Sequence, residues 1–157
     1  MKIEEYKQKR ELYAEFAETV KNIVLSVISS SIATSGYQYH LQQIQYRAKP
    51  IESLAKRLEE KGLSKADNIE EIRNDLAGCR VIFYYNDDVN EFLNSGLIRN
   101  NFKVHWDKSK IHGPSDAPKS ANNYYTANHC VIELNDDRAS LPEYAHFKGL
   151  KCEIQIQ

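Results

Sequence analysis

Two carboxylates lie in segments that otherwise favour β-strands. Asp75 opens DLAGCRVIFYY, which we expect to form a strand that is apolar on both faces, and Glu153 lies on the polar face of the alternating segment LKCEIQIQ. Burying an unpaired carboxylate is costly, so Asp75 must cap a turn, pair with a cation or hold a metal. Two carboxylates converging from different elements are what a hard divalent cation such as Mg²⁺ needs. The alternatives are a turn cap for Asp75 and a solvated strand face for Glu153.

A basic segment, YRAKPIESLAKRL, supplies groups that suit phosphate oxygens. Arg47 and Lys49 precede the start of a predicted helix, where free backbone N–H groups and the helix dipole favour anions. Ser53 and Arg57 add a hydroxyl and a guanidinium on the polar side of that helix. A solvated helix surface shows the same residue types, so that alternative stays open. The chain has no glycine-rich phosphate loop of the Walker type, which argues against that class of nucleotide enzyme.

The segment NNYYTANH combines an aromatic ring with an imidazole. In a strand, Tyr125 and His129 share a face, because side chains an even number of positions apart point the same way. Aromatic rings on sheets stack on nucleobases, which contributes about 1–3 kcal/mol per base. The same pattern is typical of half-buried tyrosine packing and of a hydrogen-bonded structural histidine.

The elements that must position these residues follow from periodicity. Apolar residues recur at three- and four-residue steps over 3–32, which predicts a long amphipathic helix ending near Gly36. A second helix begins at Pro50 and ends at Gly62. Strands are predicted at 79–85, 102–106, 125–134 and 150–157, with a helix near 89–98. This order predicts an α/β or α+β domain with a mixed sheet.

Composition limits the classes of function. At 157 residues and 41% hydrophobic, the chain suits one domain with a single core. Its 21 basic and 22 acidic residues nearly cancel, so the net charge gives no general attraction to nucleic acid or membranes. The three cysteines suit reduced core thiols. The sequence shows no leader and no apolar run near the roughly 20 residues of a membrane span, so we expect a soluble cytoplasmic protein.

Taken in order, these segments resemble the RelA/SpoT-type (p)ppGpp (alarmone) synthetase domain over residues 40–157. Each motif that carries the resemblance is weak alone, and four in the right order are fairly specific. They are the R-x-K-x-x-x-S helix start (Arg47, Lys49, Ser53), the D-L-x-G-x-R turn (Asp75, Gly78, Arg80), the aromatic-then-histidine strand (Tyr125, His129) and the E-I-Q-I terminus (Glu153, Gln155).

The resemblance implies a single α+β domain with a nucleotidyltransferase-like mixed sheet flanked by helices and a helical N-terminal segment over 1–36. It implies a GTP pyrophosphokinase of the stringent response, which transfers pyrophosphate from ATP to the 3′-hydroxyl of GDP or GTP. ATP and its phosphates would be bound by Arg47, Lys49, Ser53 and Arg57. The guanine nucleotide would be bound by Tyr125, His129 and Gln155. Asp75 and Glu153 would hold Mg²⁺, and Glu153 would also receive the proton of the attacking hydroxyl.

Two alternatives stay open beside this activity. Tyr124 in place of a family glycine, with the lysines of the loop 107–122, favours a toxic relative that pyrophosphorylates tRNA 3′ ends. Gln157 in place of a family arginine favours a non-catalytic nucleotide-sensing or partner-binding module, and the sequence stops there, so we expect a C-terminally truncated domain. The chain has no paired His-Asp motif of a metal hydrolase, so no alarmone hydrolysis is expected. Acceptor choice and oligomeric state stay open.

Overall fold

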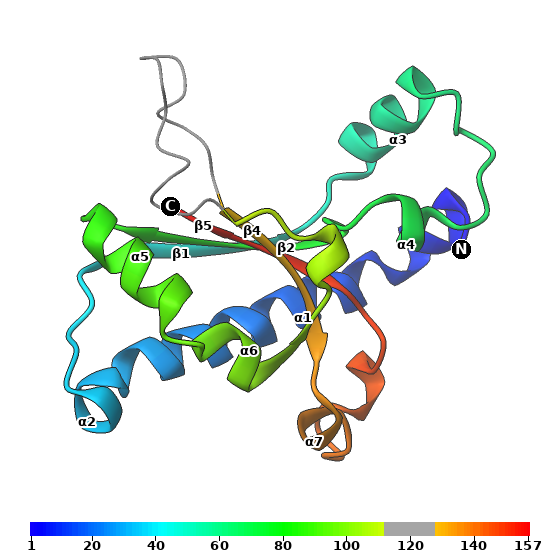
Figure 1. Cartoon of the computed structure of the whole chain (residues 1–157). Helices are drawn as coiled ribbons and strands as arrows, with labels where there is room; N and C mark the ends of the chain where they lie inside the picture. Colours follow the sequence, from blue (N-terminus) through cyan, green and yellow to red (C-terminus); the bar gives the residue numbers. More distant parts are fainter. Residues whose placement is uncertain (112–127) are drawn as a thin grey trace, which may run out of the picture.

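A five-stranded mixed sheet forms the centre of the computed structural model, which describes residues 1–111 and 128–157 (Figure 1). The strand order is β1-β2-β5-β4-β3. β2 and β5 are parallel, and the other neighbouring pairs are antiparallel. The strands are β1 (Leu41–Ala48), β2 (Ala77–Phe83), β3 (Phe102–Val104), β4 (Asn128–Leu134) and β5 (Cys152–Ile156). The expected α+β class with a mixed sheet is confirmed.

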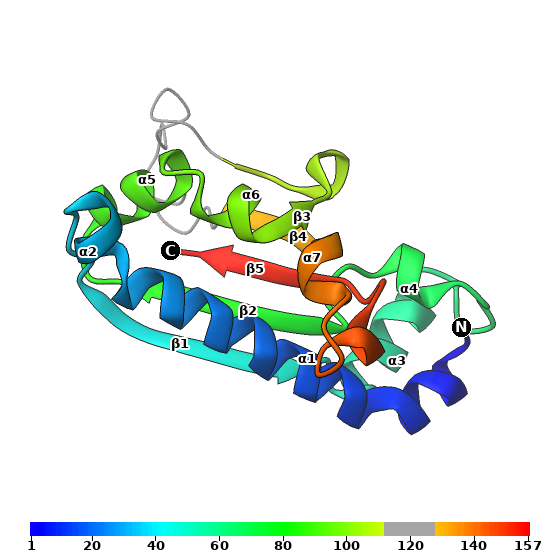
Figure 2. The same cartoon turned by 90° about the horizontal axis from the view of Figure 1, so that it is seen from below.

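The described helices cover the two faces of this sheet unequally. α1 runs beneath β1 and β2, and α6 and α7 lie on the same side (Figure 1, Figure 2). α3 rises on the opposite side, near one end of the sheet (Figure 1). The helices are α1 (Ile3–Ser29), α2 (Ser31–Ser35), α3 (Ile51–Glu60), α4 (Ile69–Ile72), α5 (Asn86–Asn94), α6 (Leu97–Asn101), α7 (Asp136–Ala139) and the 3₁₀ turns η1 (Trp106–Lys108) and η4 (Ala145–Phe147). Within residues 1–111 and 128–157, no helix has the length and apolar character needed to cross a membrane.

An apolar stripe fixes α1 against the sheet. Its buried side chains recur mostly at three- and four-residue steps, as the sequence predicted. They are Tyr6, Tyr13, Phe16, Ala17, Val20, Ile23, Val24 and Ile28. The helix is shorter than the predicted span 3–32, because it ends at Ser29 and the short α2 follows. Gly36 ends α2 with a left-handed φ of 75°, a conformation that favours glycine.

The two faces of the sheet differ in chemistry, because side chains alternate along each strand. On β5, three apolar residues are buried, whereas Glu153 and Gln155 reach the opposite face. β2 alternates in the same way, and Arg80 is exposed between buried Cys79 and Val81. The expectation that this strand is apolar on both faces was wrong, because only one of its faces packs against α1.

All three cysteines lie in the core formed by the apolar face. Cys79, Cys130 and Cys152 are free and buried, as the sequence predicted. Burial raises the pKa of Cys79 to about 12 and that of Cys130 to about 11. Since the thiolate is the reactive form, these thiols are structural rather than nucleophilic.

Several element boundaries differ from those that periodicity predicted. β1 was not predicted, because its burial pattern does not alternate and only Ala48 of its eight residues is buried. The helix expected over 89–98 is two helices, because Gly96 adopts a φ of 77° between α5 and α6. The strand expected over 102–106 ends at Val104, where the chain turns toward η1. Of the strand expected over 125–134, β4 forms 128–134, and 125–127 lie outside the described residues.

Asp88 fixes the connection between α2 and β1 against α5. Its carboxylate is 2% exposed and accepts hydrogen bonds from the Tyr37 hydroxyl (2.5 Å), the His40 backbone N–H (2.7 Å) and His40 Nδ1 (3.0 Å). Burial raises the pKa of this carboxyl, but the bonds from Tyr37 and His40 outweigh burial and hold it below its usual value. Asp88 is therefore charged at neutral pH and holds the start of β1 in place.

Replacing Asp88 by alanine leaves the Tyr37 hydroxyl and the His40 N–H without their acceptor. We expect the free energy of unfolding to fall by about 1–3 kcal/mol. The matched control is Asp87→Ala, because Asp87 lies in the same first turn of α5 but is exposed. The folded pKa of Asp88 is depressed, so its contribution is present above about pH 4 and is lost as the pH falls through the folded pKa. Urea unfolding across that range measures the effect, and equal destabilisation by the two variants would contradict it.

Candidate active site

A cavity of about 410 Å³ lies against β1, β2 and β5. The polar side chains around it belong to the face of the sheet on which α3 rises (Figure 1). Its lining includes Gln45, Arg47, Asp75, Gly78, Arg80, Glu153 and Gln155. Four residues selected from the sequence, namely Arg47, Asp75, Glu153 and Gln155, therefore meet in one place.

Strand register brings Arg47 and Glu153 to the two sides of Gly78. Gly78 pairs with Arg47 on β1 and with Glu153 on β5. Paired residues on neighbouring strands share a face, and Gly78 has no side chain, so the floor between the other two stays open. The φ of Gly78 is not positive, and an added Cβ would meet only the Arg47 carbonyl, at 4.0 Å. Glycine thus provides space here rather than a special backbone conformation.

Asp75 lies between two cations at the edge of this cavity. Lys49 Nζ donates to Asp75 Oδ2 at 2.8 Å, and Arg73 Nη2 donates to Oδ1 at 3.3 Å. Burial raises the pKa of the carboxyl, but the hydrogen bond and charge of Lys49, with the charge of Arg73, outweigh burial and hold it below its usual value. Of the three roles considered for Asp75, pairing with cations is the one formed in this structure.

Helix α1 fixes the backbone that carries Lys49. The Tyr6 hydroxyl donates to the Lys49 carbonyl at 2.7 Å, and Arg10 Nε donates to the same oxygen at 3.2 Å. Burial raises the pKa of Tyr6 to about 12, so the hydroxyl remains a donor at neutral pH. The helix that buries the sheet therefore also positions one of the cations of the site.

His129 orients Glu153 from the neighbouring strand β4. His129 Nδ1 lies 3.0 Å from Glu153 Oε1. Because a carboxylate can only accept, we assign the proton to Nδ1. Both side chains are partly buried, which strengthens this contact relative to one on an open surface. Oε1 is thus held in place, whereas Oε2 has no hydrogen-bond partner among the described residues.

Arg80 and Gln155 continue the polar row on β2 and β5. Arg80 Nε donates to Gln155 Oε1 at 3.0 Å, and the two residues are paired in register. Arg80 is part of the D-L-x-G-x-R motif but was not selected as a site residue. Its signal was present in the sequence, since an arginine between Cys79 and Val81 in an apolar strand must leave the core. Gln45 was missed because β1 itself was not predicted.

α3 presents its polar side as predicted. It begins after Pro50, with Leu54 and Leu58 buried and with Ser53 and Arg57 exposed. Neither Ser53 nor Arg57 lines the cavity. The helix therefore stands beside the cavity rather than forming its floor.

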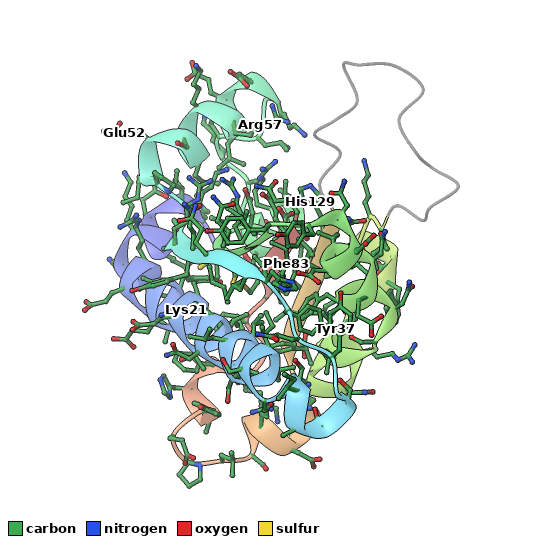
Figure 3. All side chains as sticks on the ribbon, turned by 90° about the vertical axis from the view of Figure 1, so that its left-hand side faces the viewer. Lys21, Tyr37, Glu52, Arg57, Phe83 and His129 are labelled. Atoms are coloured by element: carbon green, nitrogen blue, oxygen red, sulfur yellow. The ribbon has the colours of Figure 1, made fainter. Side chains whose placement is uncertain are left out.

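Two further predicted residues, Arg57 and His129, do not line the cavity. Arg57 Nη1 is 3.8 Å from Glu60 Oε2 on the same exposed helix surface. Figure 3 shows Arg57 on α3, well above His129, with Lys21 of α1 on the far side of the sheet. His129 reaches the site through Glu153. Tyr125 lies outside the described residues, and its stacking role stays a prediction.

The donor set fits the way in which Mg²⁺ is usually held. Asp75 and Glu153 line the same cavity. In the part of the chain that the structure describes, no group of three or more His, Cys, Asp or Glu could hold a metal ion. Mg²⁺ is typically bound by one or two carboxylates, with water and substrate phosphates at its other positions. Two carboxylates beside cations suited to phosphate match that arrangement.

Sequence comparison supplies the family. The family described as "Region found in RelA / SpoT proteins" matches residues 46–157. The chain belongs to this RelA/SpoT family. The matched segment contains Arg47, Lys49, Asp75, Glu153 and the other predicted site residues, so the resemblance drawn from the four motifs is confirmed. No curated protein matches the chain.

Solved structures share the fold over nearly the whole chain. Small alarmone synthetase 1 from Bacillus subtilis, bound to its product pppGpp, superposes with a TM-score of 0.69 at 20% identity, covering 98% of this chain and 73% of that one. A GTP pyrophosphokinase family protein from Streptococcus pneumoniae gives 0.68 at 24% identity, with 97% and 68% covered. Small alarmone synthetase 2 from Bacillus subtilis gives 0.63 at 24% identity, with 97% and 71% covered. At these identities the likeness shows a common fold.

Removing the Lys49 ammonium should change the titration of Asp75. In Lys49→Met the hydrogen bond and the charge that stabilise the carboxylate are lost, so we expect the Asp75 pKa to rise. Carbon-13 NMR of the carboxyl groups during a pH titration measures this directly. Lys56→Met is the control, because Lys56 lies exposed on α3. An Asp75 pKa that is the same in both variants would refute the pairing.

Proposed function

We propose that this chain transfers pyrophosphate from ATP to the 3′-hydroxyl of GDP or GTP, giving (p)ppGpp. The observation that carries the proposal is the meeting of Asp75 and Glu153 in one cavity, beside Arg47, within a RelA/SpoT family fold. Two fixed carboxylates and adjacent cations suit phosphoryl transfer, where positioning and charge neutralisation supply most of the catalysis. Small alarmone synthetase 1 from Bacillus subtilis has been solved bound to its product pppGpp and bound to AMPCPP, which supports the same substrates.

We assign the donor nucleotide to the β1 side of the cavity, next to α3. Arg47 would contact the nucleotide from β1, and the Lys49 ammonium would neutralise phosphate charge while staying near Asp75. Ser53 and Arg57 would reach the donor from the polar side of α3. Mg²⁺ bound by Asp75 and Glu153 would neutralise phosphate charge and hold the donor in line with the acceptor.

We assign the acceptor nucleotide to the β5 side of the cavity, next to β4. Glu153 would receive the proton of the attacking 3′-hydroxyl through Oε2, since His129 holds Oε1. Gln155 would bind the guanine nucleotide beside Glu153, and Tyr125 would stack on the base. Three buried thiols suit a reducing compartment, so we place this reaction in the cytoplasm.

Loss of either carboxylate should stop turnover without unfolding the chain. We expect Asp75→Asn and Glu153→Gln each to lower the rate of (p)ppGpp formation by on the order of 10²-fold or more. The assay is transfer of label from γ-labelled ATP to GDP or GTP with Mg²⁺, together with circular dichroism to verify folding. Asp87→Asn and Glu52→Gln are matched controls, because both carboxylates are exposed (Glu52 in Figure 3).

The acceptor is decided by the same assay with deacylated tRNA as a third substrate. Label in the guanine nucleotide supports the proposal. Label in tRNA alone would replace it with tRNA pyrophosphorylation, and that activity should weaken steeply with salt because phosphate contacts release counterions. Guanine-nucleotide binding with no labelled acceptor would instead indicate a non-catalytic sensing module.

The open floor at Gly78 gives a further prediction. An added Cβ has room there, so we expect Gly78→Ala to fold and to bind ATP nearly as well as the native chain. Gly78→Val should fold, because valine suits strands, but should fill the space between Arg47 and Glu153 and weaken ATP binding about tenfold or more. Isothermal titration calorimetry with a non-hydrolysable ATP analogue measures both. Unchanged binding by Gly78→Val would place the nucleotide elsewhere.

A further inference from the structure

A second, smaller cavity lies next to Asp75 but outside the candidate active site. Its volume is about 190 Å³, and it is formed where α1, the segment after α4 and the turn before β5 come together (Figure 2). Arg73, Lys148 and Lys151 line it, with Glu70 as the one carboxylate in its lining. Neither the family motifs nor the proposed reaction uses any of these four residues.

The charges around this cavity favour an anion. Glu70 already has a partner, since it lies 2.9 Å from the Met1 amino group. Neither Lys148 nor Lys151 forms an ion pair with a carboxylate of the described residues. Three basic residues thus line the cavity with one carboxylate that is already paired. Arg73 is shared with Asp75, at 3.3 Å, and the neighbouring Lys108 lowers the pKa of Lys151, so positive charge is crowded here and an anion would relieve it.

Arg73 has donors to offer such an anion. Its Nη2 is bonded to Asp75 Oδ1, at the long distance of 3.3 Å. Its Nε is buried and has no hydrogen-bond partner within residues 1–111 and 128–157. An unsatisfied buried donor is rare in folded proteins and commonly marks a bound water or ion. The arginine fork can bind two oxygens of one oxyanion, which lysine cannot do alone.

The size of the cavity limits what it can hold. Its volume of about 190 Å³ is less than half that of the candidate active site and lies below the range of about 300–1,000 Å³ typical of drug-sized ligands. We propose that this cavity binds a single small oxyanion, such as inorganic phosphate, through Arg73, Lys148 and Lys151.

The same guanidinium links this oxyanion to the active site. An anion bound to Arg73 weakens the hydrogen bond from Arg73 to Asp75 Oδ1. It also offsets the positive charge of Arg73, which repels a cation at Asp75. Both effects raise the affinity of Asp75 for Mg²⁺, and linkage requires that Mg²⁺ raises the affinity for the oxyanion by the same factor. This coupling rests on the proposed metal role of Asp75, whereas the oxyanion site itself does not.

The site is tested by calorimetric titration of the full chain with inorganic phosphate, without nucleotide or metal. We expect Lys148→Gln/Lys151→Gln to weaken binding about tenfold or more, because two charge-assisted bonds are lost. Arg47→Gln removes phosphate bound in the active-site cavity, so the binding that this variant retains belongs to the second cavity. Lys65→Gln, at an exposed lysine, controls for net charge and should bind like the native chain.

Three outcomes would overturn the site. They are no phosphate binding by the native chain at millimolar concentration, binding that Arg47→Gln abolishes, and equal weakening by Lys65→Gln and the double variant. Thermal unfolding verifies that the double variant is folded. If it is not, Lys148→Gln alone replaces it, because Lys148 is exposed, and it should weaken binding severalfold.

The coupling is measured separately, as Mg²⁺ affinity with and without sulfate, which forms a soluble magnesium salt. We expect sulfate to raise the affinity severalfold in the native chain and to have no effect in Lys148→Gln/Lys151→Gln. An unchanged Mg²⁺ affinity in the native chain would refute the coupling. Phosphate binding in a chain that makes no (p)ppGpp would refute the proposed function while supporting the oxyanion site.

Discussion

The parallel pairing of β2 with β5 is the constraint on which the site depends. It places Gly78 opposite Glu153, and so brings the turn that carries Asp75 beside a glutamate nearly eighty positions later. The intervening chain, through α5, α6, β3 and β4, returns to the sheet and adds β5 beside β2 rather than at an edge. A slip of one residue in this register would turn Glu153 toward α1 and fill the cavity floor with an apolar side chain.

Three carboxylates near the polar side of the sheet each pair with a basic group. Asp75 pairs with Lys49, Glu153 with His129, and Glu133 with His105 at 2.9 Å. Such pairing fixes the orientation of a partly buried acid before any ligand arrives. Contacts within the protein offset the cost of desolvating these charges. A phosphate or a metal ion therefore binds to groups that are already oriented.

Core and candidate site are built from the same elements. α1 buries the apolar face of the sheet, and its Tyr6 and Arg10 also hold the carbonyl of Lys49. Asp75 and Arg73 lie between the two cavities, so one ion pair belongs to both. Changes in packing at this end of the molecule are therefore expected to alter the candidate active site. Changes in the site are likewise expected to alter the packing around it.

Local chemistry in the sequence determined the long N-terminal helix, the start of α3 after Pro50 and the polar face that carries Glu153, because periodicity and proline geometry act over a few residues. It did not determine β1, an edge strand with almost no buried side chains, nor the break at Gly96. Only the tertiary structure decided that Asp75 is paired with Lys49 and Arg73 and shares a cavity with Glu153. Those contacts depend on strand order and register, which are set by packing between segments far apart in the chain.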